Sequence, residues 1–228
     1  MKKLYSVGIK LALVVAASAA GGQSIFYNSS KALRTRASEN ESAGLAPRNM
    51  IRVPLTRQGL SYTCGPAALS SILYYYDKSK DFFEDELAKE LKSNEEDGTL
   101  IKEMVRVAEA EGFTATTFYN WNLESLKASI DRGVPVIVLL QAWATTDQTS
   151  HDYGSDWVDG HFAIVIGYDK ANLYFMDPST FGNYTFVPIN EFLVRWHDFD
   201  GPDKVFNFGM TIVKDTPWYN RDKIFKME

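Results

Sequence analysis

Two dense apolar runs in the second half of the chain constrain its fold most strongly. Residues 134–141 read VPVIVLLQ and residues 161–168 read HFAIVIGY. Runs of this length, bounded by turn residues, are typical of buried strands. Shorter strands are predicted at 173–177, 184–187 and 208–213, with a brief helix at 189–196 between them. This half of the chain therefore predicts a sheet with a buried centre.

The first half carries helical patterns instead. After Cys64, apolar side chains recur at helical spacing, at Ala67, Leu69, Ile72, Leu73 and Tyr76. Further helices are predicted at 84–92, at 99–111 (opened by Thr99 and stopped by Gly112) and from Asn122 to Arg132, with a short strand at 113–119. Helices first and antiparallel strands afterwards predict an α+β fold.

The N-terminal region has the pattern of an export signal. Lys2 and Lys3 precede the apolar run 11–20, which ends in the small residues Ala-Ser-Ala-Ala. The run has about half the roughly 20 residues that a membrane-spanning helix needs, so we expect a cleaved signal over 1–20 and not a permanent anchor. Residues 21–50 are predicted to be a linker, and 51–228 one domain. The mature protein is expected to be periplasmic or secreted, with membrane contact only through the signal.

Composition limits the partners. The net charge of −5 argues against nucleic acid, because phosphate binding requires a basic face. Hydrophobic residues make up 45% of the chain, enough for a sizeable packed core. No cofactor is predicted.

Cys64 is the single cysteine of the chain. It can form no internal disulfide, and one thiol cannot by itself build a zinc–thiolate site. Pro66 suits the first turn of a helix, which places Cys64 at or just before a helix N-terminus. There the helix dipole favours a thiolate, and free amides can help to hold a developing oxyanion.

Three further residues complete a constellation for acyl transfer. His161 opens an apolar strand, where a general base would be rigidly held. Asp177 ends the next predicted strand, which suits it to accept a hydrogen bond from His161 and fix the ring's tautomer. Gln58, six residues before Cys64, provides an amide donor suited to an oxyanion hole.

These segments resemble a known family. The runs QGLSYTCGPAAL, DGHFAIVIGYD and LYFMDPS are similar, in this order, to motifs of the C39 cysteine peptidases. The resemblance spans about residues 50–215. It implies a papain-like fold in which a helical half, with the nucleophile at a helix N-terminus, packs on an antiparallel sheet. The implied roles are Gln58 in the oxyanion hole, Cys64 as nucleophile, His161 as base and Asp177 as orienting acid.

The resemblance also implies a peptide or protein substrate, since the best-known members trim leader peptides after Gly-Gly. Those members are domains of transporters, whereas this chain carries a predicted export signal and resembles the stand-alone C39-like branch. The leading hypothesis is an exported cysteine peptidase that acts through a thioester. A transglutaminase-like acyl transferase and a catalytically silent protein that binds peptides or a partner are the alternatives.

Simpler structural roles remain open for each residue. Cys64 could be a small core residue or form an intermolecular disulfide, His161 could be a core histidine, Asp177 could start a turn and Gln58 could be an ordinary surface residue. Segment 147–161 contains His151, Asp152, Asp156 and Asp159, which could bind a metal ion. Their spacing matches no known metal loop, so we expect a mobile loop over the active site, flanked by Trp143 and Trp157.

Overall fold

A six-stranded antiparallel sheet forms the centre of the protein. The computed structural model describes residues 47, 50–143, 152–180 and 182–227. The strand order is β1-β8-β2-β3-β4-β5, and a separate hairpin joins β6 to β7. The strands are β1 Thr114–Phe118, β2 Val136–Gln141, β3 Gly160–Tyr168, β4 Asn172–Met176, β5 Thr185–Pro188, β6 His197–Asp200, β7 Asp203–Phe206 and β8 Gly209–Val213.

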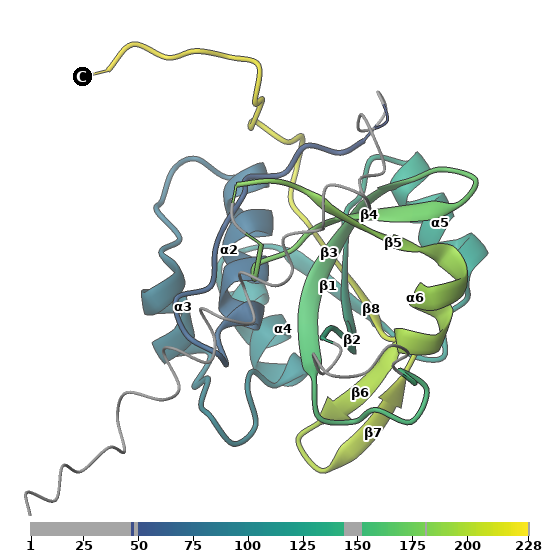
Figure 1. The fold of residues 1–228 in the computed structure, drawn as a ribbon. Helices are drawn as coiled ribbons and strands as arrows, with labels where there is room; N and C mark the ends of the chain where they lie inside the picture. Colours follow the sequence, from purple (N-terminus) through teal and green to yellow (C-terminus); the bar gives the residue numbers. More distant parts are fainter. Residues whose placement is uncertain (1–46, 48–49, 144–151, 181, 228) are drawn as a thin grey trace, which may run out of the picture.

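Helices cover the sheet from two sides. They are α2 Cys64–Tyr76, α3 Glu84–Glu90, α4 Ile101–Ala110, α5 Leu123–Asp131 and α6 Ile189–Arg195. Figure 1 shows α2, α3 and α4 to the left of the sheet and α5 and α6 to its right. The fold is thus α+β, as the sequence pattern predicts. Within the described residues, no helix combines the length and apolar character needed to cross a bilayer.

The two apolar runs form the central strand pair. β2 pairs with β3 in antiparallel register, with Leu140 opposite His161 and Gln141 opposite Gly160. All six residues of β2 are buried, because β8 and β3 flank it within the sheet and α5, α6 and β6 pack against it. α2 packs against β3 through its apolar side chains, so the start of α2 is brought to the sheet.

Several local predictions are confirmed, and one is wrong. Asn122 caps α5, since its side chain accepts a hydrogen bond from the backbone N–H of Ser125 at 2.8 Å. Thr99 does not cap α4: the N-cap is Leu100, which makes no side-chain cap bond. The Thr99 hydroxyl instead lies 2.7 Å from that of Ser93, because Thr99 is buried beneath the start of α2.

Two features at the edges of the domain were not predicted. The β6–β7 hairpin lies in a segment whose charged and aromatic residues mix without a clear period. Met50, the last residue of the predicted linker, is buried and lies against Gly167 of β3. The packed part of the chain therefore includes Met50. The predicted signal segment lies outside the described residues.

Candidate active site

Cys64 is the first residue of α2, as predicted from Pro66. The thiol is free and buried, with 7% of the residue exposed. Its neighbour Gly65 leaves no room for a side chain, since a Cβ atom there would lie 2.7 Å from the Cβ of Thr99. The Cys-Gly-Pro sequence thus lets the helix start approach the Thr99 segment closely, and the amides of this first turn have no partner within the helix.

His161 and Asp177 meet because two adjacent strands are antiparallel. β3 begins with Gly160 and His161, β4 ends at Met176, and these two strand ends lie at the same edge of the sheet. Nε2 of His161 lies 2.8 Å from Oδ1 of Asp177. Both side chains are shielded from water, with 2% and 13% of their surface exposed.

The turn after β4 holds the Asp177 carboxylate from its other sides. Oδ1 accepts hydrogen bonds from the backbone N–H and the hydroxyl of Ser179, both at 2.8 Å, and Oδ2 accepts one from the Thr180 hydroxyl at 2.8 Å. Burial disfavours the charged carboxylate, but the hydrogen bond and charge of His161 and the bonds from Ser179 outweigh it, so the pKa of Asp177 falls to about 2. Sequence reasoning did not identify Ser179 and Thr180, although an Asp two or three residues before hydroxyl side chains is an Asx-turn signal.

Cys64 is the second side chain that interacts with the His161 ring. Nδ1 is buried and has no hydrogen bond of ordinary geometry among the described residues. Burial disfavours the imidazolium, yet the interactions with Asp177 and with the side chain of Cys64 raise the pKa of His161 well above its usual range. The ring of Trp143 lies against the imidazole, with 4.9 Å between the ring centroids. The structure therefore brings Cys64, His161 and Asp177 together in series.

Gln58 lies in the segment before α2 and is tied to the Asp177 turn. Its backbone N–H donates to the carbonyl of Pro178 at 3.0 Å. Its side-chain Nε2 donates to the carbonyls of Leu60 at 2.8 Å and Ser61 at 3.3 Å, while Oε1 is buried without a partner among the described residues. The amide group is thus anchored by its own turn, and the longer contact, to Ser61, is the weaker one.

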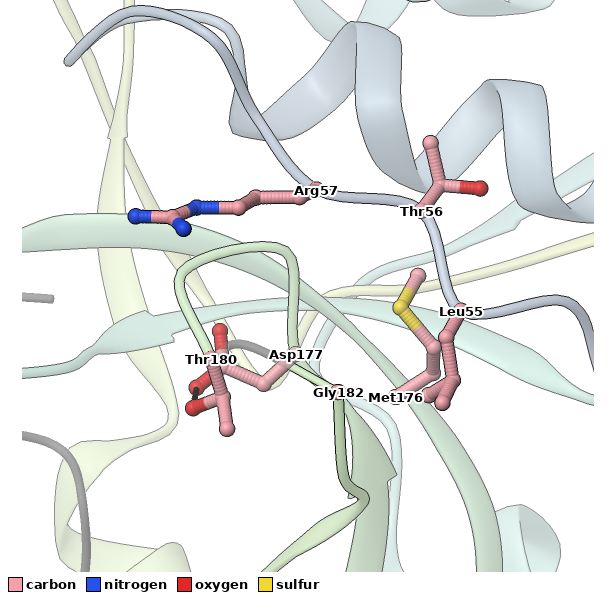
Figure 2. A pocket seen from close by; sticks show the side chains of 7 residues that line it. All are labelled: Leu55, Thr56, Arg57, Met176, Asp177, Thr180 and Gly182. Carbon is pink, nitrogen blue, oxygen red and sulfur yellow. Dashed lines mark hydrogen bonds between the residues drawn. The ribbon is translucent and has the colours of Figure 1, made fainter.

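A small pocket of about 140 Å³ lies beside Asp177. It is lined by Leu55, Thr56, Arg57, Met176, Asp177, Thr180 and Gly182. Figure 2 shows the side chains of Asp177 and Thr180 at one side of this pocket and those of Leu55 and Met176 at the other. Neither Cys64 nor His161 lines it, so the pocket adjoins Asp177 and not the Cys64 thiol.

The described part of segment 147–161 packs against the β6–β7 hairpin. His151 lies outside the described residues, and no cluster of three or more metal-ligating side chains occurs within them. Asp156 and Asp159 are buried. Trp157 packs on the hairpin, with ring centroids 4.5 Å from His197 and 5.1 Å from Phe199. Trp157 is thus part of the hairpin packing, whereas Trp143 lies at the candidate site.

Comparisons with known proteins agree with this geometry. The model of the Peptidase_C39 like family matches residues 50–203. A C39-like peptidase from Bacillus anthracis is similar in structure, with a TM-score of 0.54 and 20% sequence identity over 73% of this chain and 98% of that one. No curated protein matches the sequence significantly.

A second solved structure extends the likeness. A double glycine motif protease from an AMS/PCAT transporter, solved in complex with its leader peptide, has a TM-score of 0.50 and 19% identity, over 73% of this chain and 95% of that one. At these identities the likeness shows the fold alone, and that fold is the papain-like C39 peptidase domain.

Proposed function

Because the chain belongs to the Peptidase_C39 like family, we propose that it is a cysteine peptidase with Cys64 as nucleophile, His161 as general base and Asp177 as orienting acid. One observation carries the proposal: His161 binds Asp177 at 2.8 Å through Nε2, Nδ1 has no partner among the described residues, and the Cys64 side chain also interacts with the ring. A ring held in this way has one nitrogen fixed and the other available for proton transfer to and from the nucleophile.

The proposed reaction proceeds through a thioester. The Cys64 sulfur attacks the carbonyl carbon of the peptide bond, and the thiol proton resides on Nδ1 of His161. The C–N bond then breaks, the imidazolium gives its proton to the leaving amine, and an acyl-thioester remains on Cys64. Water attacks the thioester with His161 as base, releasing the acid and regenerating the thiol.

Two groups are proposed to hold the oxyanion. One is the backbone N–H of Cys64 in the first turn of α2, where no carbonyl within the helix accepts it. The other is the side-chain amide of Gln58. The contact of its Nε2 with the Ser61 carbonyl is long, at 3.3 Å, so the amide group can give up this contact and donate to the oxyanion after a rotation of the whole group.

Alkylation of Cys64 tests the proposed pair without a known substrate. Since the chain has one cysteine, iodoacetamide labelling followed by intact-mass analysis reports on this thiol alone. We expect rapid labelling of the folded protein at pH 6, and labelling at least about tenfold slower in His161→Ala, because the imidazolium no longer stabilises the thiolate. Equal rates in the two folded proteins would contradict the proposal.

Hydrolysis of a quenched-fluorescent peptide library then tests the reaction. Peptides containing Gly-Gly belong in this library, because the double glycine motif protease of similar fold was solved with a leader peptide. We propose leader-like peptides as the substrate class. Cys64→Ser is expected to abolish cleavage. If an added primary amine captures the acyl group in preference to water, the protein is an acyl transferase. If the Cys64→Ser variant keeps the full biological effect of the wild type, the protein acts by binding and not by catalysis.

We also propose that the protein is exported and that residues 1–20 are removed. The basic start, the ten-residue apolar run and its small-residue end support this proposal. Intact-mass analysis of the protein recovered outside the cytoplasm is expected to give a chain that begins at Gly21. Recovery of the full-length chain from the cytoplasm would contradict it.

A further inference from the structure

A second buried carboxylate lies behind the candidate base. Asp198, in β6, is 7% exposed, and its side chain packs on the backbone of Gly160, the residue before His161. A Cβ atom at Gly160 would lie only 1.8 Å from Oδ2 of Asp198. The lack of a side chain at Gly160 is therefore what allows this carboxyl group to reach the start of β3.

The fully buried Gln141 fixes both the carboxylate and the chain leading into β3. Its Nε2 donates to Oδ1 of Asp198 at 2.9 Å and to the carbonyl of His197 at 3.2 Å. Its Oε1 accepts the backbone N–H of Asp159 at 3.0 Å. One amide side chain thus ties the hairpin to Asp159, two residues before His161.

We propose that Asp198 is a positioning residue for the proposed catalytic base: together with Gln141 it fixes the start of β3, and its negative charge stabilises the imidazolium of His161. This role rests on the proposed function, because it matters for catalysis only if His161 is the base. Neither the family match nor the sequence motifs point to Asp198, which lies 37 residues from His161 in a hairpin that the sequence pattern did not predict.

The surroundings of Asp198 are consistent with an electrostatic role. Burial raises the pKa of Asp198 to about 6. The hydrogen bonds from the backbone of Phe199 and from Gln141 lower this pKa, but burial outweighs them. The negative charge of Asp156, from the segment before β3, adds to the rise, and the positive charge of His161 opposes it.

Among the described residues, the side chains next to Asp198 in β7 and β2 are uncharged. Its cross-strand partner in β7 is Val205, and Gln141 of β2 is neutral. Its neighbour His197 bonds the Asp156 carbonyl at 2.8 Å. With a pKa of about 6, the carboxylate is more than half ionised above that pH, so its charge is present while the imidazolium of His161 loses its proton.

The effect of the Asp198 charge on His161 is tested by an NMR titration of His161 in the Asp198→Asn variant. The amide keeps an oxygen for Gln141 and the shape that packs on Gly160, and it removes the charge. The imidazole signal of His161 is identified by its absence in His161→Gln. We expect its titration midpoint in Asp198→Asn to fall by about half a pH unit or more. Asp203→Asn, which removes an exposed charge from the same hairpin, is the control and is expected to leave the midpoint in place.

The contact between Asp198 and Gly160 is tested by a double-mutant cycle. Gly160→Ala forces a Cβ atom into the Asp198 carboxylate, so we expect at least about tenfold slower alkylation of Cys64 and a lower Tm. Asp198→Ala removes the obstacle, and Gly160→Ala is expected to cost less in that background. If Gly160→Ala lowers the Tm and the alkylation rate equally in both backgrounds, the proposed packing of Asp198 on Gly160 is wrong. If the titration midpoint of His161 is unchanged in Asp198→Asn, the electrostatic role is wrong.

These results are separable from the proposed function. If Cys64→Ser leaves the His161 midpoint unchanged, the proposed Cys64–His161 pair fails whatever Asp198 does. If Cys64→Ser shifts the midpoint and Asp198→Asn does not, the pair holds and the positioning role of Asp198 fails.

Discussion

Thr99 occupies the space in which a side chain on Gly65 would have to lie. A Cβ atom at Gly65 would come within 2.7 Å of the Cβ and 2.8 Å of the Oγ1 of Thr99. Thr99 is buried, and its hydroxyl is held by that of Ser93 at 2.7 Å. The helix that begins with Cys64 is therefore seated against a segment 35 residues later in the chain.

Gly65→Ala is expected to destabilise the protein by about 1–3 kcal/mol, since overpacking a buried contact displaces backbone or forces poor rotamers. For a domain of this size each kcal/mol corresponds to roughly 2–4 °C in Tm, which a thermal melt would resolve. Gly59→Ala is the matched control, because its Cβ would meet only the flexible carboxylate of Glu84, at 3.3 Å. Equal melts for the two variants would contradict the tight seating of α2.

Asp177→Asn is expected to lower stability most between about pH 4 and pH 6.5. The pKa of Asp177 is lowered from 3.8 to about 2, so its contribution is present above 3.8 and disappears as the pH falls through 2. The pKa of His161 is raised from 6.5, so its contribution is complete below 6.5 and is lost as the pH rises through the raised value. Urea denaturation at pH 3, 5.5 and 9 is expected to show the largest difference, of roughly 2 kcal/mol, at pH 5.5. A pH-independent difference would show that the ion pair is not the cause.

Thr180→Val is expected to reduce the proposed catalysis without unfolding the protein. Valine keeps the shape but removes the hydroxyl that donates to Oδ2 of Asp177 at 2.8 Å, and a hydrogen bond to a charged group contributes about 1.5–3 kcal/mol. We expect roughly tenfold slower peptide cleavage, because the carboxylate is held less firmly against His161. Thr180→Ser retains the hydroxyl and is expected to behave like the wild type; failure of this rescue would assign the effect to packing.

Asn122→Ala is expected to destabilise the protein by about 1 kcal/mol, because the backbone N–H of Ser125 loses the cap acceptor that it now has at 2.8 Å. Asn122→Asp keeps an acceptor oxygen and is expected to retain the wild-type Tm. Cys64 labelling is expected to stay unchanged in both variants, since α5 packs on the sheet away from α2 (Figure 1). A change in labelling without a change in Tm would contradict this separation.

Local signals predicted the elements well. Pro66 placed Cys64 at a helix start, Asn122 marked a helix cap, and two apolar runs of strand length marked β2 and β3. Each of these signals acts within a few residues, through a backbone bond, a dihedral preference or a burial pattern, so it can be read along the chain. Thr99 failed as a cap because a tertiary contact with Gly65 overrides its local preference.

The sequence by itself determined an α+β domain with a lone cysteine at a helix N-terminus and named the residues that could accompany it. Only the tertiary structure decided that His161 contacts Asp177, that Ser179 and Thr180 hold that carboxylate, and that Asp198 packs on Gly160, the residue before His161. These relations depend on the register of β3 with β4 and on a hairpin whose Asp198 packs on Gly160, 38 positions earlier. Register and packing are settled by how all the elements bury their apolar surfaces together, which no local pattern along the chain encodes.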